Sequence, residues 1–178
     1  MSKIIPPFNF QQWIDENRHL LQPPVCNKAV FVDGDFIVMV VGGPNGRRDF
    51  HFNEGPEFFY QLEGEMELRL MIDGKREVHP LKAGDIFLLP PRIPHSPVRF
   101  ENSIGLVVER KRVIPDESDG LMWFCESCDH KLYEEYFPLR NIETDFQEVF
   151  ARFFDDEQNR TCDKCGTVMP NSNKLQVG

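Results

Sequence analysis

The sequence has no apolar run long enough to cross a membrane, because none approaches the roughly 18 residues that a spanning helix needs. It also lacks an excess of basic residues: the formal net charge is −9, which repels phosphate backbones and argues against nucleic acid as a partner. Residues 1–12 lack the basic segment followed by an apolar segment that is typical of a secretory signal. Together these absences predict a cytoplasmic protein that binds neither membranes nor nucleic acid.

Tryptophan and tyrosine are scarce, with 2 and 3 copies, whereas phenylalanine occurs 16 times and indicates a Phe-rich core. The 178 residues suffice for one domain with a small appendage. The residue pattern changes after Pro115, where the β-prone runs give way to a segment that contains cysteine pairs. We therefore expect a β-rich domain with an N-terminal helix over residues 1–115, and an extension with a second helix over residues 116–178.

Short β-prone runs alternate with Gly, Pro and Asp breaks between residues 28 and 110. Apolar residues recur at every second position over residues 66–72, which is typical of a half-buried strand, and Asp73-Gly74 then forms a favoured hairpin turn. We predict strands over residues 28–33, 35–41, 57–62, 65–72, 76–79, 85–89 and 104–109. Many short strands at regular spacing indicate a sandwich or barrel, the class that includes jelly rolls.

Two helices are expected at the edges of this β-rich region. Residues 10–21 have apolar side chains near helical spacing, with Asn9 as a cap. Thr144 and Gln147 have the spacing of a capping box. An amphipathic series follows that box, formed by Phe146, Val149, Phe150 and Phe153.

Two stretches of the β-rich region resemble the two sequence motifs of cupins, and this resemblance implies a double-stranded β-helix, the jelly-roll barrel of that superfamily. The first stretch contains His51 and Glu57 ahead of a glycine, and the second presents His95 after a Pro-rich bend. Two departures occur: Arg92 stands where many cupins have glycine, and Asn53 stands where many have a second histidine.

The departure at residue 53 leaves His51, Glu57 and His95 as candidate metal ligands. Two imidazoles and one carboxylate suit non-haem Fe(II), and they leave coordination positions for substrate and O₂. Glu54 is the alternative carboxylate, but the cupin spacing favours Glu57. His19 and His79 are expected on the surface.

Beyond the ligands, the chain closely resembles the 3-hydroxyanthranilate 3,4-dioxygenase family over nearly its whole length. The resemblance is carried by Phe8-Asn-Phe, the segments 41–47, 86–91, 94–99 and 107–110, Trp123 and two cysteine pairs. It implies an Fe(II) enzyme that opens the ring of 3-hydroxyanthranilate with both atoms of O₂. The product would be 2-amino-3-carboxymuconate semialdehyde, which cyclises to quinolinate on the kynurenine route from tryptophan to NAD. The family also suggests a homodimer.

The resemblance implies roles for three charged residues near the ligands. Arg99 would pair with the substrate carboxylate, Glu109 would accept a hydrogen bond from the amine or hydroxyl and assist proton transfer, and Arg47 would stabilise negative charge on oxygen. Arg47 lies four residues before His51, and Arg99 lies four after His95, so strand alternation places each on the face of its ligand. Arg110, the neighbour of Glu109, should point the other way.

The extension contains four of the five cysteines, in the two C-x-x-C pairs Cys125/Cys128 and Cys162/Cys165. Two such turns can complete a tetrahedral four-sulfur site for zinc or iron, similar to a rubredoxin knuckle. Four protein ligands leave no open position, so we expect a structural role, with electron transfer as the alternative. Cys26 is expected to be a small buried apolar residue.

Two other functions fit parts of the sequence. One is another iron cupin, such as a thiol dioxygenase, because Arg99 and Glu109 beside the ligands would also suit an amino-acid substrate. The second is a non-catalytic cupin that senses or stores a ligand. The three-ligand centre argues against this second function, since a binding module has no need of open metal positions.

Overall fold

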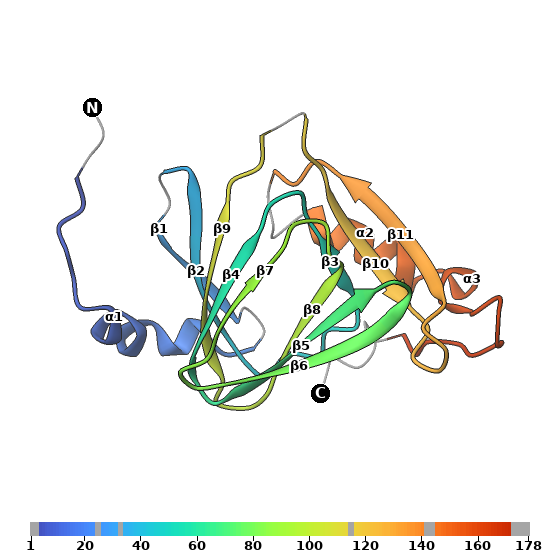
Figure 1. Cartoon of the computed structure of the whole chain (residues 1–178), viewed down its shortest axis with the longest axis horizontal. Helices are drawn as coiled ribbons and strands as arrows, with labels where there is room; N and C mark the ends of the chain where they lie inside the picture. Colours follow the sequence, from blue (N-terminus) through green and yellow to red (C-terminus); the bar gives the residue numbers. More distant parts are fainter. Residues whose placement is uncertain (1–3, 24–25, 32–33, 114–115, 141–144, 172–178) are drawn as a thin grey trace.

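The structure is a computed structural model that describes residues 4–23, 26–31, 34–113, 116–140 and 145–171. The strands form two antiparallel sheets that face each other (Figure 1). One sheet has the order β1 (Asn27–Phe31), β2 (Phe36–Gly42), β9 (Ile104–Arg110), β4 (Glu57–Glu63) and β7 (Ile86–Leu89). The other has the order β11 (Lys131–Phe137), β10 (Asp119–Phe124), β3 (Phe50–Phe52), β8 (His95–Arg99), β5 (Glu65–Ile72) and β6 (Lys75–Lys82).

This arrangement confirms the expected mainly β fold of the cupin jelly-roll type. Each of the seven predicted strands is present, although residues 32–33 of the first one lie outside the described residues. Asp73 and Gly74 both have positive φ, as the predicted hairpin turn between β5 and β6 requires. Strands β3, β8, β10 and β11 were not predicted: β3 is only three residues long, β8 contains Pro97, and the other two lie in the cysteine-containing segment.

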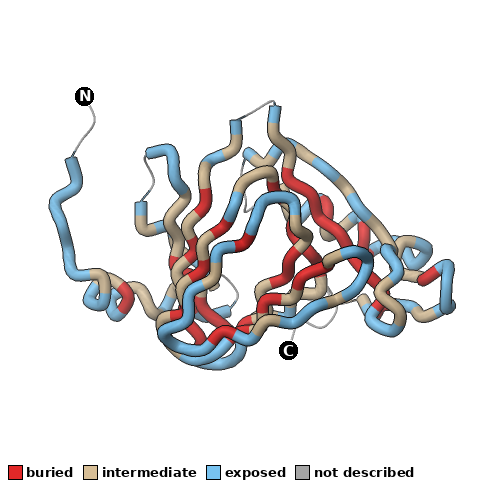
Figure 2. The backbone as a smooth tube through the Cα atoms, in the orientation of Figure 1, coloured by how far each residue is buried: buried red, intermediate tan, exposed pale blue. Residues whose placement is uncertain are grey.

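The core between the sheets is apolar and follows from the alternation of β5 and its neighbours (Figure 2). Every second side chain of β5, from Met66 to Leu70, is at most 2% exposed. They pack with side chains of the adjacent strand β6 and of the facing strands β4, β7 and β9 in one cluster, whose other members are Phe59, Leu81, Leu89 and Val107. This cluster fills one part of the barrel interior, and the polar residues of the candidate site occupy the other part.

Helices cover the two ends of the sheets (Figure 1). At one end, α1 (Phe10–Asn17) continues into the short 3-10 helix η1 (Arg18–Leu20), and Asn9 caps α1 by accepting a hydrogen bond from the Gln12 amide at 2.9 Å. At the other end lie α2 (Asp145–Phe154) and α3 (Glu157–Arg160). Thr144, the first residue of the predicted capping box, lies outside the described residues. None of the helices within the described ranges is long and apolar enough to cross a bilayer.

The residues after 115 extend the barrel as well as covering it. Strand β10 pairs with β3, and β11 pairs with β10, so both belong to the larger sheet. Helix α2 packs on β10 through Phe153, whose ring stacks on the fully buried Trp123 with centroids 4.2 Å apart. Strands from both predicted domains, 1–115 and 116–178, therefore belong to one sheet. That the two parts are separate domains stays a prediction.

Candidate active site and cysteine centre

Three strands bring His51, Glu57 and His95 together inside the barrel. His51 is in the middle of β3, Glu57 begins β4, and His95 begins β8, where it pairs directly with His51. All three are at most 7% exposed. Glu57 Oε1 lies 3.2 Å from His95 Nε2 and 3.5 Å from His51 Nδ1. The predicted ligands thus present two imidazole nitrogens and a carboxylate to one point.

Each of the two histidines is oriented by a second contact on its other ring nitrogen. His95 Nδ1 lies 3.0 Å from the Ile93 carbonyl oxygen, and His51 Nε2 lies 2.7 Å from Asp119 Oδ1. Contacts of this kind fix the tautomer and the ring orientation of metal-ligating histidines. They leave His95 Nε2 and His51 Nδ1 as the nitrogens that face Glu57.

The carboxylate of Glu57 is held in its charged, ligating form. Burial raises its pKa, but the charges and hydrogen bonds of His95 and His51 outweigh burial and lower the pKa well below its ordinary value. Asn53 donates from its amide nitrogen to Glu57 Oε1 at 2.5 Å. Glu54, the alternative carboxylate, points elsewhere and contacts Arg92 Nε at 2.6 Å. The donor set therefore fits a metal ion that prefers mixed nitrogen and oxygen ligands.

Glu109 lies directly beside the three ligands. It pairs with Glu57 across β9 and β4, is 6% exposed, and accepts a hydrogen bond from Asn53 at 3.2 Å. Burial and the charge of Glu57 raise its pKa, although Arg112, 2.7 Å away, partly opposes this rise. The adjacent Arg110 contacts Glu117 instead, so it points away from the ligands as expected.

Arg99 is a buried guanidinium whose partner is neutral. It is 2% exposed, and its terminal nitrogen donates to Gln61 Oε1 at 3.1 Å, whereas its Nε has no partner. Among the described residues no carboxylate pairs with it. Burial, together with the positive charge of Arg47, lowers the pKa of Arg99 to about 10. A buried cation without a counter-ion is a ready site for an anionic ligand.

Arg47 occupies the loop between β2 and β3 and forms an ion pair with Asp49, which is 3% exposed. Burial lowers the pKa of Arg47, but the charges of Asp49 and Glu57 raise it above its ordinary value. The positive charge of Arg47 also acts on Glu57 and on Arg99, where it lowers the pKa of Arg99. Glu109 therefore lies beside the ligands, Arg99 lies four residues after His95 on β8, and the roles of Arg47, Arg99 and Glu109 stay predictions.

Sequence reasoning missed Asp119 and Arg112, which connect the two sides of the site. Asp119, fully buried at the start of β10, contacts His51 and also accepts from Arg112 Nε at 3.0 Å. Arg112 in turn reaches Glu109. A sequence pattern could not have linked residues of the predicted extension to a ligand in the barrel, because the pairing of β10 with β3 was not expected.

The four cysteines of the two pairs form a second compact group, outside the barrel. Their Sγ atoms lie 3.5 Å apart for Cys125 and Cys165, and 3.6 Å apart for Cys128 and Cys162. Tetrahedral ligation at a metal–sulfur distance of about 2.3 Å places sulfurs about 3.8 Å apart, whereas a disulfide joins them at about 2.05 Å. The thiols are free, so their arrangement fits a metal centre.

The two cysteine turns have the same local form. In each, the residue after the second cysteine adopts positive φ: Asp129 in the first turn and Gly166 in the second. In each, the backbone N–H of that residue donates to the carbonyl of the first cysteine, at 3.0 and 2.8 Å. Two matching turns face each other because β10 ends just before Cys125 and α3 ends shortly before Cys162.

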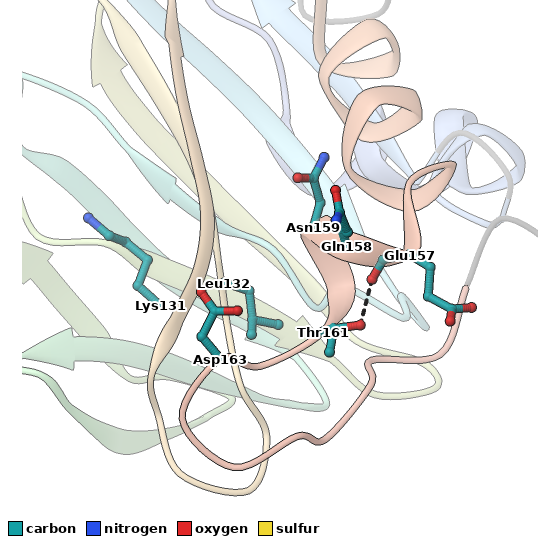
Figure 3. A pocket seen from close by; sticks show the side chains of 7 residues that line it. All are labelled: Lys131, Leu132, Glu157, Gln158, Asn159, Thr161 and Asp163. Carbon is teal, nitrogen blue, oxygen red and sulfur yellow. Dashed lines mark hydrogen bonds between the residues drawn. The ribbon is translucent and has the colours of Figure 1, made fainter.

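An open surface depression lies beside the second turn, between β11 and α3 (Figure 3). Its lining is polar and of mixed charge, formed by Lys131, Leu132, Glu157, Gln158, Asn159, Thr161 and Asp163. Thr161 Oγ1 donates to the Glu157 carbonyl at 2.7 Å, and Lys131, Glu157 and Asp163 are exposed. None of the barrel ligands lines it, so it is separate from the candidate active site.

The barrel and its His/Glu centre define the class of this protein as a metal-site cupin. The profile of the 3-hydroxyanthranilic acid dioxygenase family matches residues 1–154. The chain belongs to this family, whose members are metal-dependent dioxygenases.

Relatives from two bacteria support this assignment over nearly the full chain. The 3-hydroxyanthranilate 3,4-dioxygenase of Xanthomonas euvesicatoria is 58% identical over 167 residues, covering 94% of each chain. The enzyme of the same name from Bacillus thuringiensis is 46% identical over 171 residues, covering 96% of this chain and 95% of its own. Among solved structures, a cupin-2 domain protein from Shewanella frigidimarina is 16% identical, with a TM-score of 0.46 over 55% of this chain and 92% of its own.

Proposed function

We propose that this protein opens the aromatic ring of 3-hydroxyanthranilate by inserting both atoms of O₂, with Fe(II) held by His51, Glu57 and His95. The observation that carries this proposal is the presence, in one barrel interior, of a two-histidine, one-carboxylate donor set and a buried Arg99 without a counter-ion. The first suits non-haem iron, and the second suits the carboxylate of an aromatic acid.

Fe(II), when bound, would supply open coordination positions for the substrate and O₂ and a path for electrons from the ring to oxygen. The protein residues supply orientation. Arg99 would hold the substrate carboxylate through two parallel hydrogen bonds, from its unpartnered Nε and from the terminal nitrogen that does not donate to Gln61. Phe59, 2% exposed with its ring 6.2 Å from that of His95, offers an apolar wall for the aromatic ring.

Two further residues would handle proton and charge. Glu109 would accept a proton from the substrate hydroxyl or amine. Its raised pKa lies closer to neutral pH than the pKa of an exposed glutamate, which suits this role. Arg47, whose positive charge acts on Glu57, would stabilise the negative charge that develops on oxygen as the ring opens. The product would be 2-amino-3-carboxymuconate semialdehyde, which cyclises to quinolinate on the route to NAD.

For the four cysteines we propose a structural iron or zinc ion. Four sulfurs complete a tetrahedral site and leave no position for a substrate. Metal analysis of the purified protein would name the ion, and two metal equivalents per chain are expected when the barrel centre is also full.

We also propose that the protein is cytoplasmic and forms a homodimer. Strand β7 is an edge strand that exposes Ile86 and Leu88 to 66% and 65%, and such a row of apolar side chains favours association. Light scattering should give a mass of two chains.

The activity is tested by purifying the protein without oxygen, loading it with Fe(II), adding 3-hydroxyanthranilate and admitting O₂. We expect the semialdehyde absorbance to rise, with one O₂ consumed for each substrate. Protein from which the barrel metal has been removed serves as the control. Absence of turnover at full iron loading would overturn the proposal.

A further inference from the structure

Strands β4, β8 and β9 each place two buried residues of the site region on their interior faces, spaced four positions apart, so that the six residues form two levels. Strand alternation keeps residues i and i+4 on the same face, about 13 Å apart along the strand. The level of Glu57, His95 and Glu109 and the level of the guanidinium are therefore built on the same three strands, whereas the third metal ligand, His51, comes from β3. The pairs are Glu57 and Gln61, His95 and Arg99, and Glu109 and Gly105.

Gly105 provides the space in which the Arg99 guanidinium lies. Gly105 pairs with Gln61 across β9 and β4, and a Cβ atom at residue 105 would lie 2.5 Å from one terminal nitrogen of Arg99 and 3.0 Å from the other. A side chain there would displace the guanidinium. The position of Arg99 is thus set from one side by the absence of a side chain.

Gln61 sets the position of Arg99 from another side. It is 1% exposed, and its amide nitrogen donates to the Glu63 carbonyl at 2.7 Å and to Ser103 Oγ at 2.9 Å. With the amide nitrogen held in this way, Oε1 points to Arg99, 3.1 Å from its terminal nitrogen. The partner of the buried cation is therefore a firmly oriented, uncharged acceptor.

We infer that Gln61 is a specificity-determining positioning residue, which orients Arg99 for the substrate carboxylate while leaving its charge unneutralised. This inference rests on the proposed function. A carboxylate at residue 61 would pair with Arg99 internally and compete with the substrate for the same guanidinium. A neutral amide orients the cation and leaves it without a counter-ion, so a negatively charged ligand can complete the pair.

The test compares two ligands that differ only in the carboxylate. Anaerobic titration of the Fe(II)-loaded protein measures the Kd of 3-hydroxyanthranilate and of 2-aminophenol, which lacks the carboxylate. In Gln61→Glu we expect the Kd of 3-hydroxyanthranilate to rise about 10- to 150-fold, the range for losing a hydrogen bond to a charged group. The Kd of 2-aminophenol should stay within about twofold of wild type, because that ligand does not use Arg99.

Steady-state kinetics provides an independent readout. Because Arg99 binds a part of the substrate that does not react, KM should rise in Gln61→Glu while kcat changes little. Gln147→Glu is the matched control, since it adds the same charge at an exposed position of α2. It should leave both Kd values and KM unchanged. Full iron loading and an unchanged unfolding transition establish that the variants are folded.

Gln61→Met serves as a second variant, because a glutamate beside the Glu63 carbonyl could prevent folding. Methionine removes the acceptor without adding charge, so the Kd of 3-hydroxyanthranilate should rise only about 3- to 10-fold. Equal affinity of the wild type and of both folded variants for 3-hydroxyanthranilate would overturn the inference; if Gln61→Glu does not fold, Gln61→Met decides alone. If the wild type itself fails to prefer 3-hydroxyanthranilate over 2-aminophenol, the carboxylate role of Arg99 in the proposed function fails instead.

Discussion

The barrel centre and the cysteine centre are both compact groups of potential ligands, but they are assembled in opposite ways. The barrel centre takes three ligands from three strands, and all three are buried. The cysteine centre takes four ligands from two turns, and Cys165 in the second turn is exposed. Three ligands leave open positions for chemistry, whereas four sulfurs close the coordination shell.

This difference teaches where each centre obtains its geometry. A C-x-x-C turn places two thiols by local backbone alone, so the cysteine centre needs only the meeting of two turns. The barrel centre depends on strand pairing and on residues that orient the ligands. Strand β10 links the two, because Asp119 at its start contacts His51 and Cys125 follows its last residue. Helix α2 adds a second link, since Phe146 lies 5.5 Å from the His51 ring.

The largest effect is expected from His95→Ala, which removes one of the three barrel ligands. Two ligands cannot hold the ion firmly, so the barrel iron and the turnover should both be lost, while the cysteine metal remains. Plasma mass spectrometry of the metals and an oxygen electrode measure the two outcomes. His19→Ala, at an exposed position of η1, is the control that should keep both. A full barrel metal content in His95→Ala would show that His95 is not a ligand.

Asp119→Asn tests whether the barrel centre depends on the strand that leads to the cysteines. The change weakens the acceptor that orients His51 and removes the charge that pairs with Arg112. Loss of such an orienting contact typically lowers metal affinity about 10- to 100-fold. Competition with a chelator of known affinity measures the Kd for Fe(II).

Asp155→Asn, at an exposed position just after α2, is the matched control for Asp119→Asn. It should leave iron affinity unchanged, and both variants should retain the cysteine metal. An unaltered Kd in Asp119→Asn would separate the two centres and reduce Asp119 to a structural partner of Arg112.

Much of the barrel could be predicted because its signals are local. The alternation in residues 66–72, the Asp73-Gly74 turn and the spacing of Arg47 and Arg99 from the ligands each depend on a few neighbouring residues. The choice of Glu57 over Glu54 as the ligand carboxylate followed from the spacing of the cupin motif. The contact of Glu54 with Arg92 agrees with this choice. Local patterns thus predicted seven of the strands, and the predicted ligands and the charged residues near them rest on the same kind of pattern.

The unpredicted part of the site depends on contacts between residues far apart in the chain. Asp119 acts on His51, which lies 68 residues earlier, and Gln61 acts on Arg99, 38 residues later. Neither has a neighbouring motif that distinguishes it from an ordinary polar residue. Strands β3 and β8 were missed because three residues or an internal proline give weak β patterns, and the pairing of β10 with β3 could not be inferred without them.

Cys125→Ser should have a smaller effect on catalysis than either change in the barrel. It removes a ligand of the closed centre, so the cysteine metal should be lost and the melting temperature should fall by about 2–4 °C for each kcal/mol of stability. Folded Cys125→Ser protein should keep its barrel iron and most of its turnover. Cys26→Ser, remote from the cysteine centre, is the control that should keep both metals. Lost turnover in a folded, iron-loaded Cys125→Ser protein would favour electron transfer through the cysteine centre.

The smallest effect is expected from Gly166→Ala, which compares the two cysteine turns with each other. Gly166 has φ of +76°, and no atom lies within 4 Å of the point that an added methyl group would occupy, so alanine would meet backbone strain without a clash. A left-handed conformation costs alanine about 1–2 kcal/mol, whereas aspartate tolerates it better, and Asp129 adopts it in the first turn. Urea unfolding should show a loss of about 1 kcal/mol with the metal retained. Gly46→Ala, which has open space and no positive φ, should change stability by less than about 0.5 kcal/mol. An equal loss of stability in Gly166→Ala and Gly46→Ala would mean that the second turn relaxes to accommodate alanine, and that the metal centre does not fix the conformation of this turn.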